Sequence, residues 1–562
     1  MKELSDQIRG IIFVALVLLI TLVWLHFYQP SIPQKPVASA PQTAPGQTAS
    51  QTARIAATPA PAHPVAIPTI QASREKTIVV ESTLYRVELL NRGGVVRSWK
   101  LKNYLTDEKP PQPLDLVNPD AANELGWPFS LVLSDKQLEA EVNSGLYEIT
   151  PSSASVIAPA AIELHWSDGH LDVVKKLNFT QEYQMSAEVS VTLDGKPLSA
   201  AVAWRGGFGD KAVYRASQLV NVFYRQNGKL NLLTYKKLGV SGNQTEAFEQ
   251  AGPMEFTGIE DQFFTATFIP NGTDLSLWHW TQWHHYTANN QPVSDPAPEM
   301  AAGSPNPGPV KMRAYVGPKD LTLLGKVQPS LETLINFGWT GVIAKPLLFA
   351  LQWLHKYIPN YGWAIVVFTL LITMALVPIR VWSFHSMRKM QIVAPEIKAI
   401  QDRYKKYSMS DPRKRKMNEE VMAVYQREGI NPVGSCLPML VQLPFLWAFY
   451  RMLVGAIELR HAPWIWWIHD LSARDPYYIL PIALAVSTYL MTRMTPTPAS
   501  VDPAQQRMMA LMPLMTAFIF FYLSSGLNLY YFTSTLIQAG QQWYLNRSQP
   551  LPSRSKFKKK KE

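Results

Sequence analysis

Five long uncharged stretches of apolar residues constrain this chain more than any other feature of its sequence. Four of them are short enough for one transmembrane helix each: Gly10–Tyr28, Tyr357–Ile379, Gly429–Tyr450 and Pro476–Thr492. The fifth, Met508–Asn546, has 39 residues, which is too long for one helix. Ser524, Ser525 and Gly526 near its middle predict a tight turn between two short spans. We therefore expect a polytopic α-helical membrane protein with six transmembrane helices.

The first apolar stretch fits either a retained membrane anchor or a cleavable signal peptide. The small-residue segment Ala38–Ala40 begins ten residues beyond the stretch and follows several prolines, so a retained anchor over residues 1–28 is favoured. Lys2 and Arg9 precede the span and predict a cytoplasmic N-terminus. Residues 29–74 are rich in proline, which predicts a semi-extended periplasmic linker.

The net charge of +11 is concentrated in two segments. Residues 380–430 hold 12 Lys and Arg against six Asp and Glu, and residues 547–562 hold seven against one. Each segment carries +6, so the rest of the chain sums to −1. With the N-terminus inside, six crossings place both basic segments in the cytoplasm, as basic loops prefer. The number of spans and the charge distribution therefore agree.

Period-two alternation of apolar and polar residues dominates from about residue 77 to residue 317. The clearest run is Leu171, Val173, Lys175, Leu177 and Phe179. Glycine-rich turn signals separate such runs, which is typical of antiparallel strands. We expect residues 75–328 to form an all-β periplasmic sandwich domain, large enough to bury its own core.

Two further helical patterns flank the second span. Apolar residues fall on one helical face from Leu331 until Pro346 interrupts, and this predicts an amphipathic interfacial helix within residues 329–356. Residues 357–546 are expected to form the five-helix membrane core. Within it, residues 384–430 predict a cytoplasmic helical hairpin with narrow apolar seams and basic outer faces. The seam residues are Ile397, Ile400, Tyr404, Tyr407, Met417, Val421 and Val424.

The sequence offers no motif for an enzyme. It lacks the glycine-rich loop that cradles nucleotide phosphates, and its single cysteine, Cys436, excludes an intramolecular disulfide and a cysteine-only zinc site. Glu260 and Asp261 are a possible acid–base pair. Adjacent strand residues point to opposite faces, however, so a solvated edge is the favoured interpretation. We expect no enzymatic activity, no cofactor and no bound metal.

Polar residues inside the apolar stretches are the strongest functional signal. A hydroxyl or amide facing lipid costs several kcal/mol on the harsher transfer scales, so these groups are expected to face inward. Hydrogen bonds between helices would explain any one of them. Taken together they favour a water-filled cavity. The candidate positions are Thr369, Thr373, Gln442, Tyr530, Tyr531 and Ser534.

Several motifs are long enough to be specific. Three lie in the predicted membrane core: Asn431, Pro432, Gly434, Pro438, Gln442 and Pro444; Trp467–Pro481; and Ser525, Gly526, Leu527, Leu529, Tyr530 and Tyr531. Two lie in the β domain: Gly258–Phe264 and Tyr315–Lys319. With them the chain resembles the YidC-type membrane protein insertases, in the Gram-negative branch that carries a large periplasmic domain.

This resemblance implies a multi-pass protein of the bacterial inner membrane that inserts and helps fold nascent membrane proteins, alone or with the Sec translocon. It implies a hydrophilic groove open to the cytoplasm, without nucleotide hydrolysis, in which Thr369 and Tyr531 face the substrate. The basic hairpin and the basic tail (547–562) would contact the ribosome or the anionic surface of the phospholipid bilayer.

One position departs from the family pattern. Such insertases have a groove arginine where this chain has Thr373. Arg380 lies seven residues further, about 10 Å nearer the cytoplasm at 1.5 Å per residue. We expect Arg380 either to supply charge at the mouth of the groove or simply to mark the cytoplasmic boundary.

Two other classes of function remain open from the residues alone. A solute or ion transporter would also need polar groups in a helical bundle, although no intramembrane carboxylate or internal repeat is evident. An envelope-binding module with a membrane anchor is the other class. In that case Trp278, Trp280 and Trp283 of the β domain would stack on a sugar ring, although packing in the core is the commoner fate of tryptophan.

Overall fold

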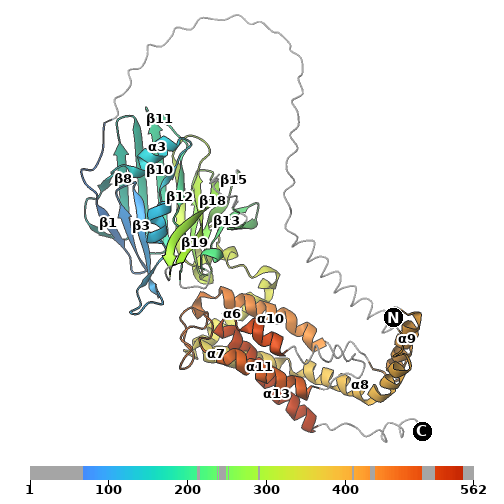
Figure 1. The fold of residues 1–562 in the computed structure, drawn as a ribbon. Coiled ribbons are helices and arrows are strands. Elements are labelled where there is room, and N and C mark those ends of the chain that lie inside the picture. Colours follow the sequence, from blue (N-terminus) through green and yellow to red (C-terminus); the bar gives the residue numbers. More distant parts are fainter. Residues whose placement is uncertain are drawn as a thin grey trace, which may run out of the picture.

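The protein consists of a large β domain followed by a bundle of helices, as seen in a computed structural model (Figure 1). The structure describes residues 68–211, 216–236, 238, 248–250, 252–288, 291–407, 411–430, 437–495 and 513–548. The predicted anchor (1–28), most of the predicted linker and residues 549–562 of the predicted basic tail lie outside these residues.

The β domain contains three sheets within the described residues. One five-stranded sheet has the order β4 (Pro113–Asp115), β3 (Val95–Leu105), β2 (Tyr85–Leu90), β1 (Thr77–Glu81) and β7 (Ser155–Ile157). A second five-stranded sheet has the order β15 (Phe248–Gln250), β18 (Ser276–Ala288), β19 (Gln291–Gly303), β12 (Ala201–Trp204) and β5 (Leu131–Val132). Within each sheet the strands pair antiparallel, except that β1 and β7 are parallel.

The third sheet has ten strands, which alternate along the chain with strands of the other two sheets. Its order is β14 (Lys229–Thr234), β13 (Asn221–Gln226), β16 (Phe256–Glu260), β17 (Phe264–Pro270), β20 (Val310–Pro318), β10 (Gln184–Leu193), β9 (Leu171–Phe179), β8 (Ala160–Ser167) and β6 (Glu148–Thr150), and β11 (Lys196–Pro197) pairs with β10. Trp99 of β3 contacts Phe179 of β9, and Phe129, next to β5, contacts Phe268 of β17. The expected all-β domain is therefore present.

Strand β9 follows the predicted alternation. Leu171, Val173, Leu177 and Phe179 are buried, and the residues between them are more exposed. Lys175 shares the buried face at 1% exposure, and its ammonium group donates to three backbone carbonyls, those of Gly93, Gly94 and Phe129. Burial lowers the pKa of Lys175 to about 7. The buried face of β9 thus tolerates Lys175 because the turn around Gly93 and the Phe129 carbonyl supply hydrogen-bond acceptors for its ammonium group.

Short helices fill the gaps between strands and lead into the helical part. They are α2 (Pro119–Leu125), α3 (Lys136–Ser144), α4 (Ala216–Leu219), α5 (Leu321–Lys326) and the 3-10 turns η1 (Glu332–Leu334) and η2 (Gly338–Thr340). Asn118, Asp135 and Asp320 accept hydrogen bonds from backbone N–H groups at the starts of α2, α3 and α5, which is why those helices begin there.

The amphipathic helix predicted within 329–356 starts later than the sequence pattern indicates. Two 3-10 turns replace its first half, and Gly338 there has a φ of +57°, which an α-helix cannot accommodate. Helix α6 then spans Gly341–His355 and continues through Pro346 instead of ending at it. Proline removes one backbone hydrogen bond. The buried face of α6 outweighs that loss by packing Leu348 and Leu351 in the core.

The remaining helices lie in the predicted apolar stretches or in the predicted hairpin. They are α7 (Tyr361–Ala375), α8 (Val377–Arg403), α9 (Pro412–Arg427), α10 (Leu437–Gly455), the turn η4 (Ile457–Leu459), α11 (Ile479–Met494) and α13 (Ser525–Ser548). Residues 513–520 are also helical and are separated from α13 by a short turn, so the division of the last stretch near Ser524 is confirmed. Helix α13 packs against both α11 and α7.

The length and hydropathy of the helices bear on membrane crossing. In the described ranges, no individual helix combines the length and the hydropathy of a membrane span. Helices α7 and α8 meet these criteria only together, and they meet at a bend of 53°. Pro378 lies in the first turn of α8, where proline is tolerated and where the previous helix must end.

Helices α8 and α9 form the predicted hairpin, which extends from one end of the bundle (Figure 1). The predicted seam is confirmed for Ile397, Ile400 and Val424, which are buried, and for Tyr404, Met417 and Val421, which pack against them. Met390, Val393, Tyr425 and Ile430 complete this separate small core.

Candidate functional site

The seven candidate groove residues, which are the six polar positions and Arg380, come from four helices. Thr369 and Thr373 lie on α7, Arg380 on α8, Gln442 on α10, and Tyr530, Tyr531 and Ser534 on α13. All seven are buried or half-buried. Thr369 is 0% exposed and Thr373 is 3% exposed, although both belong to an apolar helix. The structure therefore places these polar groups inside the bundle.

One hydrogen bond joins two of these seven described residues across helices. The Arg380 Nη2 atom donates to Gln442 Oε1 at 3.3 Å. Arg380 is also close enough to Tyr530 for an electrostatic interaction between them. The bend between α7 and α8 sets the direction of this arginine, because Arg380 lies in the first turn of α8. A cation and an amide thus meet between α8 and α10, and a phenol of α13 lies within electrostatic range of the cation.

An aromatic stack supports this polar group. The rings of Phe449 on α10 and Tyr530 on α13 lie parallel, with centroids 3.9 Å apart and an interplanar angle of 11°. The ring of Phe368 on α7 also contacts Phe449, with the two ring centroids 5.7 Å apart. Tyr531 contacts Tyr530 and Phe520. The stack holds α7, α10 and α13 together, so the position of Tyr530 is fixed by packing.

Two of the candidate hydroxyls bond within their own helices. Thr369 Oγ1 donates to the Ile365 carbonyl at 2.7 Å, and Ser534 Oγ accepts from Gln538 Nε2 at 2.7 Å. Such bonds satisfy a hydroxyl in an apolar setting. The structure therefore brings Arg380, Gln442 and Tyr530 together, whereas Thr369 and Ser534 contribute polarity from their own helices.

Asn528 is not one of the seven candidate groove residues, yet it organises the turn before α13. It is 0% exposed, and its Nδ2 atom donates to the carbonyls of Phe520, Leu523 and Ser524. These carbonyls belong to the break in the last apolar stretch. The sequence signal was an asparagine two residues after Gly526, since asparagine side chains commonly bond nearby backbone groups.

The β domain contains a cavity of about 610 Å³, far from these helices in sequence. Residues 72–78 and 147–154 form most of its lining, and none of the candidate groove residues contributes to it. The tryptophans considered for sugar stacking do not form a common platform, because Trp283 lies on the opposite face of β18 from Trp278 and Trp280. Trp280 is buried and donates to the Glu299 carboxylate at 2.6 Å.

The favoured interpretation of Glu260 and Asp261 as a solvated edge is wrong. Their exposed fractions are only 4% and 6%. Glu260 forms an ion pair with Lys319 at 3.1 Å, and Lys319 also donates to the Asp261 carbonyl. Asp261 accepts three backbone N–H groups, and one of them belongs to Asp210. Burial raises the pKa of Asp261 to about 6. The two β-domain motifs therefore meet in one buried network.

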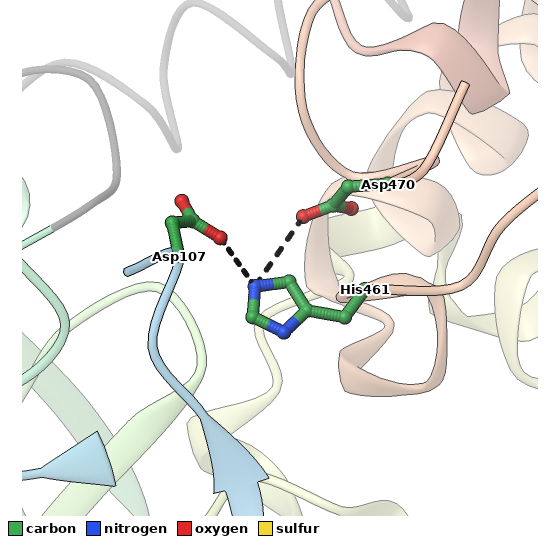
Figure 2. A group of neighbouring side chains, drawn as sticks. All are labelled: Asp107, His461 and Asp470. Carbon is green, nitrogen blue, oxygen red and sulfur yellow. Dashed lines mark hydrogen bonds and ion pairs between the residues drawn. The ribbon is translucent and has the colours of Figure 1, made fainter. Parts of the chain in front are cut away.

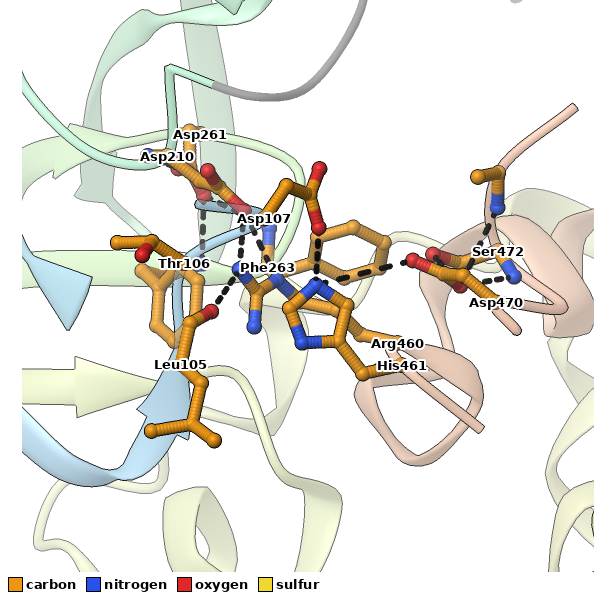
Figure 3. Close-up of polar contacts among 12 residues, drawn as sticks. Leu105, Thr106, Asp107, Asp210, Asp261, Phe263, Arg460, His461, Asp470 and Ser472 are labelled. Atoms are coloured by element: carbon orange, nitrogen blue, oxygen red, sulfur yellow. Dashed lines mark hydrogen bonds and ion pairs between the residues drawn. The ribbon is translucent and has the colours of Figure 1, made fainter. Parts of the chain in front are cut away.

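This network continues into the helical part (Figure 3). Asp210 forms an ion pair with Arg460, which follows η4, at 2.6 Å, and Arg460 also donates to the Leu105 carbonyl at 2.7 Å. Nearby, Gln262 Nε2 donates to the carbonyl of Val454 in α10 at 3.0 Å. We call Leu105, Asp210, Asp261 and Arg460 the domain junction. It attaches the β domain to the segment between α10 and α11.

Comparison with known proteins agrees with this two-part architecture. Residues 77–350 match the family described as YidC periplasmic domain, and residues 353–552 match the family described as 60Kd inner membrane protein. The class is therefore an inner membrane protein with a periplasmic domain, and the β domain described above is that domain.

Relatives over most of the chain identify the family. A membrane protein insertase YidC of Cupriavidus pinatubonensis is 31% identical over 85% of this chain and 84% of its own length. Another, from Laribacter hongkongensis, is 29% identical over 96% of this chain and 98% of its own length. The chain belongs to the YidC family of membrane protein insertases.

A solved structure is matched at lower identity. A crystal structure of an active YidC insertase, with its first transmembrane domain resolved, is 18% identical and covers 86% of this chain and 95% of its own. Its TM-score is 0.35. The resemblance inferred from the sequence motifs is confirmed by the family matches.

Proposed function

We propose that this chain inserts nascent membrane proteins into the inner membrane and helps them to fold. The relatives that carry the name membrane protein insertase support this proposal. In it, the chain crosses the membrane six times, and the hairpin of α8 and α9 and the C-terminus lie in the cytoplasm. The seven candidate groove residues line a hydrophilic groove that is open to the cytoplasm.

The observation that carries the proposal is the hydrogen bond between Arg380 and Gln442, at 3.3 Å, between helices of a membrane bundle. A charge at the centre of a bilayer costs about 2.5 to 3.5 kcal/mol even on the lenient insertion scale. Such a group therefore needs a polar partner or water. A groove containing both would give a hydrophilic substrate segment a shorter path through hydrocarbon.

Short helices would reduce that path further. Helix α7 has 15 residues, so at about 1.5 Å per residue it measures roughly 22 Å, compared with about 30 Å for the apolar part of a bilayer. Helix α11 has 16 residues. A bilayer adapts to short spans by thinning. The driving force is then the entry of the substrate's own apolar helix into lipid, and the process needs no nucleotide hydrolysis.

The basic segments suggest the partners. Helices α8 and α9 bury a narrow seam, and their outer faces carry exposed Lys and Arg such as Lys398, Arg413 and Arg415. We propose that this hairpin and the tail contact ribosomal RNA, whose phosphates favour clustered cations. Cooperation with the Sec translocon belongs to the same proposal and draws on the family membership alone.

Site-specific photocrosslinking of stalled nascent chains tests the groove. A photoreactive amino acid at Thr369, Gln442 or Tyr531 is expected to crosslink to the hydrophilic segment of the substrate. The same probe at Leu371, which is exposed on α7 at 56%, is a matched control and should label the apolar helix or lipid instead. Equal labelling of the hydrophilic segment from Leu371 and Thr369 would contradict the proposed groove.

A further inference from the structure

Three side chains with metal-binding atoms converge beside the domain junction (Figure 2). Asp107 comes from the loop after β3, and His461 and Asp470 come from the segment between η4 and α11. The His461 Nε2 atom lies 2.6 Å from Asp107 Oδ1 and 4.0 Å from Asp470 Oδ2. One ligand atom from each residue lies within 4.8 Å of the other two. This is the one such group of three among the residues that the structure describes.

The charge around this cluster is unbalanced. Two carboxylates face a single imidazole nitrogen, and among the described contacts no Lys or Arg bonds either carboxylate. The neighbouring Arg460 is occupied by Asp210 and by the Leu105 carbonyl. With a neutral imidazole the cluster has two negative charges, which a divalent cation would neutralise.

Asp470 is already held in a position to act as a ligand. Its Oδ1 atom accepts hydrogen bonds from Ser472 N at 2.7 Å, from Ser472 Oγ at 2.7 Å and from Ala473 N at 3.3 Å. These bonds fix the carboxylate and leave Oδ2 facing His461 (Figure 3). Hydrogen bonds of this kind to a ligating carboxylate orient it and strengthen metal binding.

The cluster is open enough for an ion and water to enter. The side chains of Asp107, His461 and Asp470 are 59%, 29% and 19% exposed. A tetrahedral zinc ion with bonds of about 2.0 to 2.2 Å separates its ligand atoms by about 3.3 to 3.6 Å. Small side-chain movements would bring the three atoms from their present distances to those values, and water would occupy the fourth position.

We propose that Asp107, His461 and Asp470 form a binding site for a divalent transition-metal ion, with zinc as the best match. An imidazole nitrogen with two carboxylate oxygens suits zinc, whereas magnesium and calcium prefer oxygen ligands alone. The metal would replace the proton that now joins His461 to Asp107. It would tie the loop after β3 to the segment before α11, and so fasten the β domain to the membrane part beside the Arg460–Asp210 ion pair. The proposal does not depend on insertase activity.

Equilibrium dialysis of the full-length chain in detergent, without a histidine tag, tests the site. With zinc chloride as the probe, the chain is expected to bind one equivalent and to show a higher thermal midpoint in zinc than in chelator. Cobalt(II) in place of zinc should give the visible absorption bands of a tetrahedral site. A chain that binds no zinc, or whose midpoint does not change, would overturn the proposal.

Conservative variants localise the binding. Asp107→Asn, Asp470→Asn and His461→Gln should each weaken zinc binding by about tenfold or more. Asparagine at 470 keeps the oxygen that accepts from Ser472 and Ala473, so this variant tests the ligand without removing the turn. His170→Ala is the matched control, because His170 bonds Asp194 at 2.9 Å without a third ligand in reach. Unchanged affinity in all three site variants, or an equal loss in the control, would refute the site.

Discussion

Arg460 and Asp210 are 250 residues apart in the sequence, yet their side chains form an ion pair of 2.6 Å at the junction of the two domains. Both side chains are almost fully buried, with exposed fractions of 4% and 3%. Arg460 also lies over the ring of Phe264. Arg460 pairs with Asp210, and the backbone N–H of Asp210 donates to the Asp261 carboxylate between β16 and β17. These contacts connect the membrane part to the ten-stranded sheet of the β domain.

Arg460→Ala is expected to destabilise this junction by about 3 to 5 kcal/mol, because it leaves the Asp210 carboxylate buried without a counter-charge. Hydrogen exchange should become faster at Leu105 and around Asp210, and the thermal midpoint should fall. Lys176→Ala is the control, since its ion pair with Glu163 is about half exposed and contributes at most about 1 kcal/mol. Similar changes in the two variants would argue against a special role for Arg460.

Gly209→Ala is expected to disturb the same junction from the opposite side. Gly209 has a φ of +90°, and a Cβ atom there would overlap the Asp261 carboxylate. Gly195→Ala provides a matched control, because Gly195 also has a positive φ, +77°, but has open space around it. Backbone strain of about 1 to 2 kcal/mol should affect both variants. Gly209→Ala should lose further stability because of the overlap with Asp261, so its urea unfolding midpoint should be the lower of the two. Equal urea midpoints for the two variants would contradict this expectation.

The stability of the β domain is expected to depend on pH through the buried carboxyl of Glu299. Burial raises its pKa from 4.5 to about 7, despite hydrogen bonds from Gly206 and Trp280. Well below pH 4.5, the carboxyl is protonated in both states. Between pH 4.5 and 7 the unfolded chain releases the proton while the folded chain retains it, so stability falls as pH rises. The loss is about 3 kcal/mol over this window.

The matched variant for this test is Glu299→Gln, which cannot titrate. The urea midpoint of the β domain, followed by tryptophan fluorescence in the full-length chain, should fall less steeply from pH 4.5 to 7 in the variant. Asp261, with its pKa raised to about 6, contributes a smaller slope that remains in both proteins. Parallel curves for wild type and variant would show that Glu299 does not titrate in this range.

Arg380→Ala is expected to lower the insertion of a substrate with an acidic tail by roughly tenfold, corresponding to about 1.5 kcal/mol for opposite charges near 10 Å in a partly polar setting. Arg380→Lys keeps the charge and should keep most of the activity. Insertion of the same substrate with a neutral tail should change little. A protease-protection assay measures the insertion of both substrates by the wild type and the two variants. An unchanged yield of the acidic-tail substrate in Arg380→Ala would exclude Arg380 as the source of attraction.

Adding Thr373→Arg to the Arg380→Ala variant asks whether charge at either depth is sufficient. The side chain at 373 is buried on α7, seven residues before Arg380 and on the other side of the bend between α7 and α8. Partial recovery of the acidic-tail substrate is expected if an arginine on α7 can replace the one on α8.

Local patterns in the sequence were enough to predict many of the elements. The alternation in β9, the seam of the α8–α9 hairpin around Ile397 and the break near Ser524 all follow from the spacing of apolar residues. The position of α6 was less predictable. Its packing against the core overrides the signal from Pro346, and packing cannot be read from one helix alone.

Local periodicities of two and 3.6 residues were sufficient to predict a β domain followed by apolar helices, and to locate the polar residues within the apolar stretches. The burial of Glu260 and Asp261, the contact of Arg380 with Gln442, and the convergence of Asp107, His461 and Asp470 become evident only from the three-dimensional packing. The reason is physical: each of these groups depends on side chains from segments far apart in the chain. Their burial and pairing are fixed only when the β domain and the helices pack together.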